Sequence, residues 1–112
     1  MTDNESLLIQ RTREKLDEGF HVYNLYDVVK LLREMSASTR WPTACFVLLT
    51  VARDIIYDWD KQPVPSVEAD SVGAQLQPLF CRVLDLMAQD ADVQQMSAAL
   101  DDLVLVVTEL RG

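Results

Sequence analysis

The segment from Pro42 to about Trp59 constrains the fold of this chain more than any other. Its apolar residues form two adjacent stripes at helical spacing, so a helix here has an apolar surface too wide for one neighbour to cover. Proline suits the first turn of a helix because its missing N–H group is not needed there. We therefore predict a central helix that is buried on two sides. Its stripes contain Ala44, Val47, Leu48, Val51, Ile55 and Trp59, and beside them Cys45, Phe46, Leu49 and Ile56.

Two helices are predicted ahead of this central one. Thr2 and Glu5 have the spacing of a capping box, and Gly19 is suited to the left-handed turn that ends a helix. The apolar content between them is thin, so we expect the first helix to lie on the surface or on a partner. Asn24 is predicted to cap the second helix, which runs to about Ser36.

Residues 60–70 are predicted to form the one long loop, because they carry two prolines and several charges without periodicity. A fourth helix follows, and Pro78 complicates its start. The helix begins either at Gln77 or Pro78, or near Ser71 with a kink where Pro78 removes a backbone hydrogen bond. We favour the kinked helix.

The last helix is predicted to start after Asp92, which with Gln95 forms a second capping pair. Apolar residues then recur every three or four positions as far as Leu110. Residues 103–107, LVLVV, would suit a short buried strand equally well. We prefer a helix because the sequence offers no convincing partner strand.

The expected architecture is all-α. With 112 residues the chain has the size of one domain, and with only 3 Gly and 4 Pro it is poor in the residues that punctuate β-rich folds. We predict a single helical domain over residues 1–112: an up-and-down helical bundle of four core helices plus an N-terminal surface helix.

The net charge and the hydropathy of the chain limit the classes of partner that it is expected to bind. The net charge of −8 repels phosphate backbones and anionic lipid surfaces, so we expect no nucleic acid and no membrane as partners. No apolar run approaches the length of a membrane span. Cys45 and Cys81 lie in apolar runs, where reduced thiols pack as small hydrophobes, so we expect a cytoplasmic protein. Nothing in the sequence calls for a cofactor.

The excess acid is concentrated in the second half of the chain, where residues 57–112 carry 10 acids and three bases. Such a run is either a solvated face that keeps the protein soluble or an electrostatic docking face for a basic partner protein. The candidate partner-binding residues lie between Arg82 and Arg111: Asp85, Asp90, Asp92, Asp101, Asp102 and Glu109.

Asp54 and Asp58 are the strongest candidates for chemistry. They fall at i and i+4 on one helical face, where two carboxylates repel each other unless a cation lies between them. A divalent metal could be that cation if a further carboxylate approached from another helix. Otherwise the two are solvated, or are satisfied by Lys61, Arg53 or Arg40.

The sequence therefore favours a binding protein over an enzyme. His21, the only histidine, is read as a polar residue just ahead of a helix, since no sequence signal pairs it with a nucleophile or metal ligand. We predict a non-enzymatic interaction or regulatory module, homodimeric, that docks a partner through the acidic face or an apolar groove. The alternative is a metal-dependent hydrolase of a small phosphorylated substrate that uses Asp54 and Asp58.

Overall fold

Helices make up 87% of this computed structural model, which describes residues 3–62 and 65–111 and contains no strand within them. The all-α prediction is confirmed, and residues 103–107 are helical. Thr2, expected to cap the first helix, lies outside the described residues. The helices are α1 (Asp3–Glu18), α2 (Val22–Ser36), α3 (Pro42–Lys61), α4 (Ser66–Ala88) and α5 (Val93–Arg111).

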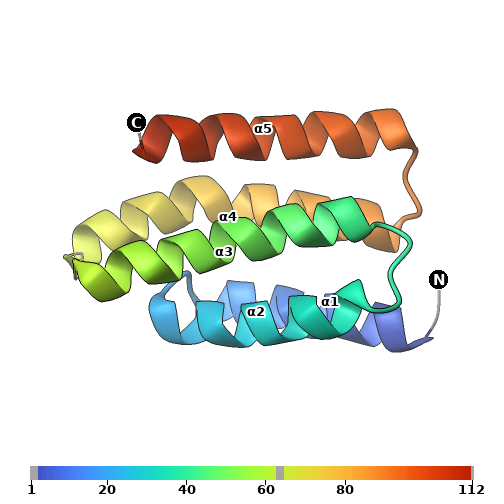
Figure 1. Cartoon of the computed structure of the whole chain (residues 1–112), viewed down its shortest axis with the longest axis horizontal. Coiled ribbons are helices and arrows are strands. Elements are labelled where there is room, and N and C mark those ends of the chain that lie inside the picture. The colour runs from blue at the N-terminus through green and yellow to red at the C-terminus, as the bar shows by residue number, and fades with distance from the viewer. Residues whose placement is uncertain (1–2, 63–64, 112) are drawn as a thin grey trace.

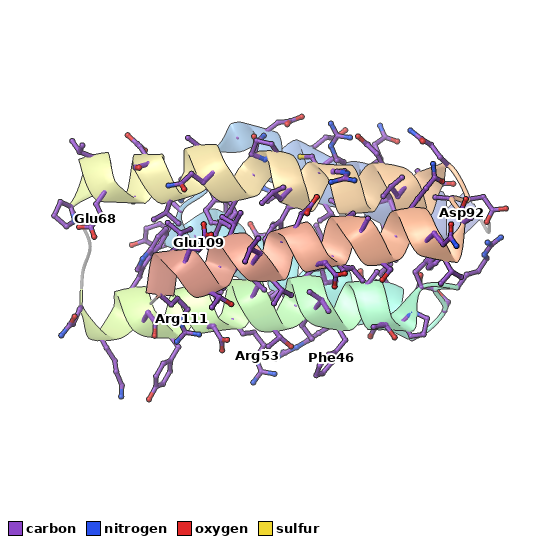
Figure 2. All side chains as sticks on the ribbon, turned by 90° about the horizontal axis from the view of Figure 1, so that it is seen from above. Phe46, Arg53, Glu68, Asp92, Glu109 and Arg111 are labelled. Atoms are coloured by element: carbon purple, nitrogen blue, oxygen red, sulfur yellow. The ribbon has the colours of Figure 1, made fainter. Side chains whose placement is uncertain are left out.

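The helices run along one long axis and alternate in direction (Figure 1). α1 and α2 form one layer, α3 and α4 form the middle layer, and α5 lies alone on the other side of that layer. Seen from above, α5 covers the line between α3 and α4 (Figure 2). Within the described residues, no helix has the length and apolar content to cross a lipid bilayer.

α1 contributes to the core, and this differs from the surface helix expected at the N-terminus. Leu8, Ile9 and Leu16 are buried, and the Thr12 hydroxyl is buried as well, donating to the Leu8 carbonyl at 2.7 Å. The helix packs against both α2 and α4. The apolar stripe of α1 is thin because most of the rest of the helix surface, including Arg11, is exposed. The finer prediction of four core helices plus a surface helix is therefore not confirmed.

α3 is buried broadly, as its two stripes predicted, except that Phe46 of the second stripe is 65% exposed. Seven of its residues are buried, and it packs against both α2 and α5. Pro42 occupies its first turn. The buried residues of α3 are Ala44, Cys45, Leu48, Val51, Ala52, Ile55 and Ile56.

The loop predicted over residues 60–70 is much shorter in the structure, because α3 continues to Lys61 and α4 already begins at Ser66. The early start of α4 brings Gly73 against Phe20, so that a Cβ atom at Gly73 would lie 2.8 Å from the Phe20 Cβ. The helix passes through Pro78, as expected for the longer of the two alternatives. Close packing on Phe20 therefore anchors the part of α4 that precedes the proline.

The turn between α1 and α2 uses its polar residues differently from the prediction. Gly19 has a φ of +144°, in the region that favours glycine, as expected at the end of α1. α2 begins at Val22 with His21 ahead of it, so the prediction that Asn24 caps this helix is wrong. The Asn24 side-chain amide instead donates to the carbonyls of Gly19 at 2.9 Å and Lys15 at 3.3 Å. Asn24 thus satisfies the carbonyls left free at the end of α1.

Candidate functional site

The six acidic residues predicted to bind a partner do not form one face. Asp85 in α4 pairs with Arg13 of α1, across two helices. Asp90, in the turn after α4, pairs with Arg40 in the turn between α2 and α3. These two carboxylates are already paired within the chain, so they are less available for a partner.

Asp92 and Asp102 are also engaged within the chain. Asp92 accepts a hydrogen bond from the Gln95 backbone N–H at 2.8 Å, and the Gln95 side chain accepts one from the Asp92 N–H at 3.3 Å. This is the predicted capping pair, and it begins α5. Asp102 lies 2.7 Å from Arg82 of α4, at an exposed position where such a pair stabilises the fold only weakly.

Asp101 and Glu109 are the two members of the set for which the described part of the chain offers no ion pair. Both are exposed on α5, and they lie on the side of this helix that is opposite its buried residues Met96, Ala99 and Leu103. Two apolar side chains share this surface: Leu105 is 59% exposed and Val104 is 48% exposed. We call the surface the α5 outer face, and it consists of Asp101, Val104, Leu105, Thr108 and Glu109.

Asp54 and Asp58 share one arginine. Arg111, in the last turn of α5, places Nη1 3.1 Å from Asp54 Oδ2 and Nη2 3.2 Å from Asp58 Oδ2. Figure 2 shows Arg111 at the end of α5 where it approaches α3. We call this arrangement the Arg111 clamp. It relieves the repulsion between the two carboxylates, and it forms one wall of a cleft of about 510 Å³ between α3, α4 and α5.

The bases expected to satisfy these two carboxylates lie elsewhere. The Lys61 ammonium sits 4.5 Å from the centre of the Tyr57 ring, and Arg40 pairs with Asp90. Arg111 was missed because it lies 53 residues from Asp58 in the sequence, and no local pattern brings them together. Within residues 3–62 and 65–111, no three His, Cys, Asp or Glu side chains are grouped so that they could hold a metal ion.

The two cysteines are free thiols on different helices. Cys45 is buried in α3, and this burial, helped by the negative charge of Glu5, raises the pKa of its thiol to about 11. Desolvation likewise raises the pKa of the half-buried Cys81. Both groups are therefore protonated and weakly nucleophilic at neutral pH.

Aromatic residues at one end of the bundle are a further feature that sequence reasoning did not select. Phe20, His21, Tyr23, Tyr26 and Trp59 line a cleft where α1 meets α2 and α3 ends. The segment FHVYNLY at 20–26 was the available signal, since it places four rings in seven residues. Nothing in the sequence indicated that Trp59 would join them.

Comparison of the chain with protein-family models, with curated proteins and with solved structures finds no match. Functional inference for this chain therefore starts from the geometry of its own side chains. Three features of the structure are candidates: the α5 outer face, the Arg111 clamp and the cleft lined by these aromatic residues.

Proposed function

We propose that this protein is an interaction module that binds a basic amphipathic helix of a partner protein along the α5 outer face. The observation that carries the proposal is the combination of exposed Leu105 and Val104 with two carboxylates, Asp101 and Glu109, that have no ion pair among the described residues. A helix in a groove or against another helix is held by apolar anchors at helical spacing, and flanking charges select the partner.

The spacing of this surface suits a helical partner. Asp101, Leu105 and Glu109 follow one another at intervals of four, so they form a stripe with an apolar centre and an acidic residue on each side. A partner helix with a large apolar residue between two lysines or arginines would match it. The net charge of −8 would raise the rate at which such a partner associates.

The same stripe argues against a homodimer through this surface. A two-fold axis beside Leu105 would place Asp101 of one copy next to Glu109 of the other, and like charges placed together oppose association. A homodimer that forms through a different surface remains a prediction. One apolar candidate is Phe46, which is 65% exposed and projects from α3 on the side away from α5 (Figure 2).

The alternative function, a metal-dependent hydrolase, receives less support. A divalent cation at Asp54 and Asp58 would have to displace the guanidinium of Arg111. Calorimetric titration of the protein with magnesium or manganese tests this alternative, and we expect no binding heat at millimolar metal.

We place the protein in the cytoplasm, where its free thiols would stay reduced.

The docking proposal is tested with a basic amphipathic peptide as the probe. Fluorescence anisotropy measures its affinity for the protein and for the double variant Asp101→Lys with Glu109→Lys. We expect at least about a tenfold loss, or about 1.4 kcal/mol, because both carboxylates become repulsive. Leu105→Ala should weaken binding without a change of charge.

A matched control separates local recognition from net charge. Glu14→Lys with Glu34→Lys makes the same change of charge at exposed positions on α1 and α2, away from α5. We expect this control to lose much less affinity than the α5 variant. Equal losses would mean that only the overall charge attracts the peptide, and the docking proposal would then be wrong. Analytical ultracentrifugation of Phe46→Glu beside the unaltered protein tests the homodimer separately.

A further inference from the structure

One end of the bundle is open. Here α1 ends, α2 begins and α3 ends near the start of α4, and a cleft of about 790 Å³ lies among them. This is the left-hand end of the molecule in Figure 1. We call it the open-end cleft, and its size falls in the range of small-molecule sites in proteins.

The floor of the open-end cleft is held by aromatic packing. The Phe20 ring meets the Trp59 ring edge to face, with centroids 6.5 Å apart and an angle of 82° between the rings. Behind it, Phe20 packs in the same way on Phe80, with centroids 5.6 Å apart. Phe80 is fully buried, so the Phe20 and Trp59 rings are anchored in the core while they line the cleft.

The outer wall is aromatic as well. Tyr23 is 82% exposed, although it is a large residue in the first turn of a helix. Its ring packs edge to face on His21, with centroids 6.3 Å apart. An exposed tyrosine held beside another ring keeps a face available to a ligand.

The charges that line the cleft have a single sign. The Tyr26 hydroxyl donates to Asp60 Oδ2 at 2.8 Å, and this hydrogen bond raises the pKa of Tyr26 and orients the carboxylate. Asp70 of α4 and Glu18 of α1 also line the cleft. Glu18 is bound by Lys15 at 3.4 Å, whereas Asp70 has no ion pair among the residues described. No Lys or Arg side chain of the described ranges is part of the lining.

Aromatic faces and carboxylates together select one kind of ligand. The face of an aromatic ring carries negative potential and attracts a cation within about 6 Å of its centre. Carboxylates add attraction for the same charge and repel anions. An uncharged apolar ligand would gain from the rings but would also have to desolvate the carboxylates, which is unfavourable.

A contact between a cation and an aromatic ring is present elsewhere in the protein, outside the cleft. The Lys61 ammonium lies 4.5 Å from the centre of the Tyr57 ring. Tyr57 does not line the open-end cleft, and among the described residues no Lys or Arg lines it. A ligand in the cleft would supply the cation that Lys61 supplies to Tyr57.

We infer that the open-end cleft binds an alkylammonium group, held over the Tyr23 and Trp59 rings and balanced by Asp60 and Asp70. The group can be a small quaternary amine or the end of a lysine side chain, since both present the same charge on an apolar stem. This site is separate from the α5 outer face, so its binding does not depend on the docking function proposed above.

The test compares a cation with a neutral molecule of the same shape. Choline and 3,3-dimethyl-1-butanol differ in the charged nitrogen, and each is titrated while the amides of residues 20–26 and the Trp59 indole are followed by NMR. We expect choline to bind about three- to tenfold more tightly, a ratio in the range of a cation over aromatic rings. A third titration with an N-acetyl, C-amide trimethyl-lysine distinguishes the sources, because a partner side chain would favour it over choline.

Three variants locate the binding site. Tyr23→Ala and Asp70→Asn are exposed changes that should weaken choline binding several-fold and leave the unfolding transition in place. Tyr57→Ala is the matched control: it removes another exposed tyrosine and should leave binding unchanged. The inference is wrong if choline and its neutral analogue bind equally, if neither amine binds at millimolar concentration, or if Tyr23→Ala and Tyr57→Ala behave alike. Peptide binding to the α5 outer face should be the same in all three variants.

Discussion

Both ends of the bundle consist of helix termini and turns, but they differ in the side chains found there. The end where α2 meets α3 and α4 meets α5 has only a smaller cleft, of about 320 Å³, and we call it the closed end. Glu5 is buried there and accepts a hydrogen bond from the Thr39 hydroxyl at 3.0 Å. Arg40 pairs there with Asp90 across two turns. At the open end, the rings around the cleft remain partly exposed. Polar side chains therefore pair with one another at one end, whereas at the other end aromatic rings anchored on the core also line a cleft.

Truncating one large side chain at each end should have very different effects on stability. Met35, at the end of α2, is fully buried, so Met35→Ala should reduce the free energy of unfolding by about 2–5 kcal/mol through lost burial and a cavity. Tyr23→Ala at the open end should change it by less than about 0.5 kcal/mol. Urea unfolding measures both. Similar losses in the two variants would contradict the division of roles.

Asn24→Ala tests whether the open end also contains a structural element. This change removes the donor to the partly buried carbonyls of Gly19 and Lys15, so it should cost about 1 kcal/mol, the lower end of the range for an acceptor left without a partner. Asn4→Ala, at an exposed position on α1, is the matched control and should have little effect. Urea midpoints of the two variants check this prediction, which fails if both variants retain the unaltered stability.

Asp92→Ala tests the contribution of the α5 cap at the closed end, where we expect a small effect. Loss of the cap of α5 should cost about 1 kcal/mol, while Asp92→Asn keeps an oxygen acceptor and should lose only a fraction of that. The change in thermal midpoint of both variants is the measurement. An equal shift for alanine and asparagine would indicate that the charge of Asp92, and not its cap, is what matters.

The pH dependence of stability should report on Cys45. The folded state holds the thiol proton up to a pKa of about 11, whereas the ordinary value is 9.0, so the folded state binds more protons between these values. Stability contributed by this thiol is therefore full below pH 9 and declines as the pH rises towards 11. Urea midpoints measured at pH 8 and pH 10 should converge more in Cys45→Ala than in the unaltered chain.

Local signals in the sequence predicted the helices well where one signal dominated. Pro42 fixed the first turn of α3, and Asp92 with Gln95 fixed the start of α5. The start of α4 was placed too late because its first turns have little apolar periodicity; Gly73 packs there on Phe20, a contact made across the fold. Local patterns identified the starts of α3 and α5 but not those of α2 and α4, and they do not reveal which distant residue covers a face.

The candidate sites show the same limit. The stripe on α5 is readable from spacing, but only the structure separates Asp101 and Glu109 from the four acids that are already engaged. Likewise, Asp54 and Asp58 are visibly paired in sequence, whereas their partner Arg111 comes from the far end of the chain. Contacts between residues far apart in sequence decide which charges are available, and these contacts follow from the packing of whole helices.

The position of α5, alone in its layer, gives it a distinct place in the opening motions of the protein. A helix that packs on one side opens at a lower free energy than one held between two layers, so its amide hydrogens should exchange with solvent before those of α3. Besides the buried residues of α5 and its Asp102–Arg82 pair, the capping pair at its first turn and the Arg111 clamp at its last are two contacts that oppose this opening. A partner bound to the α5 outer face would add another. The exchange rate of amides near Leu103 is thus a readout of occupancy that needs no label on the partner.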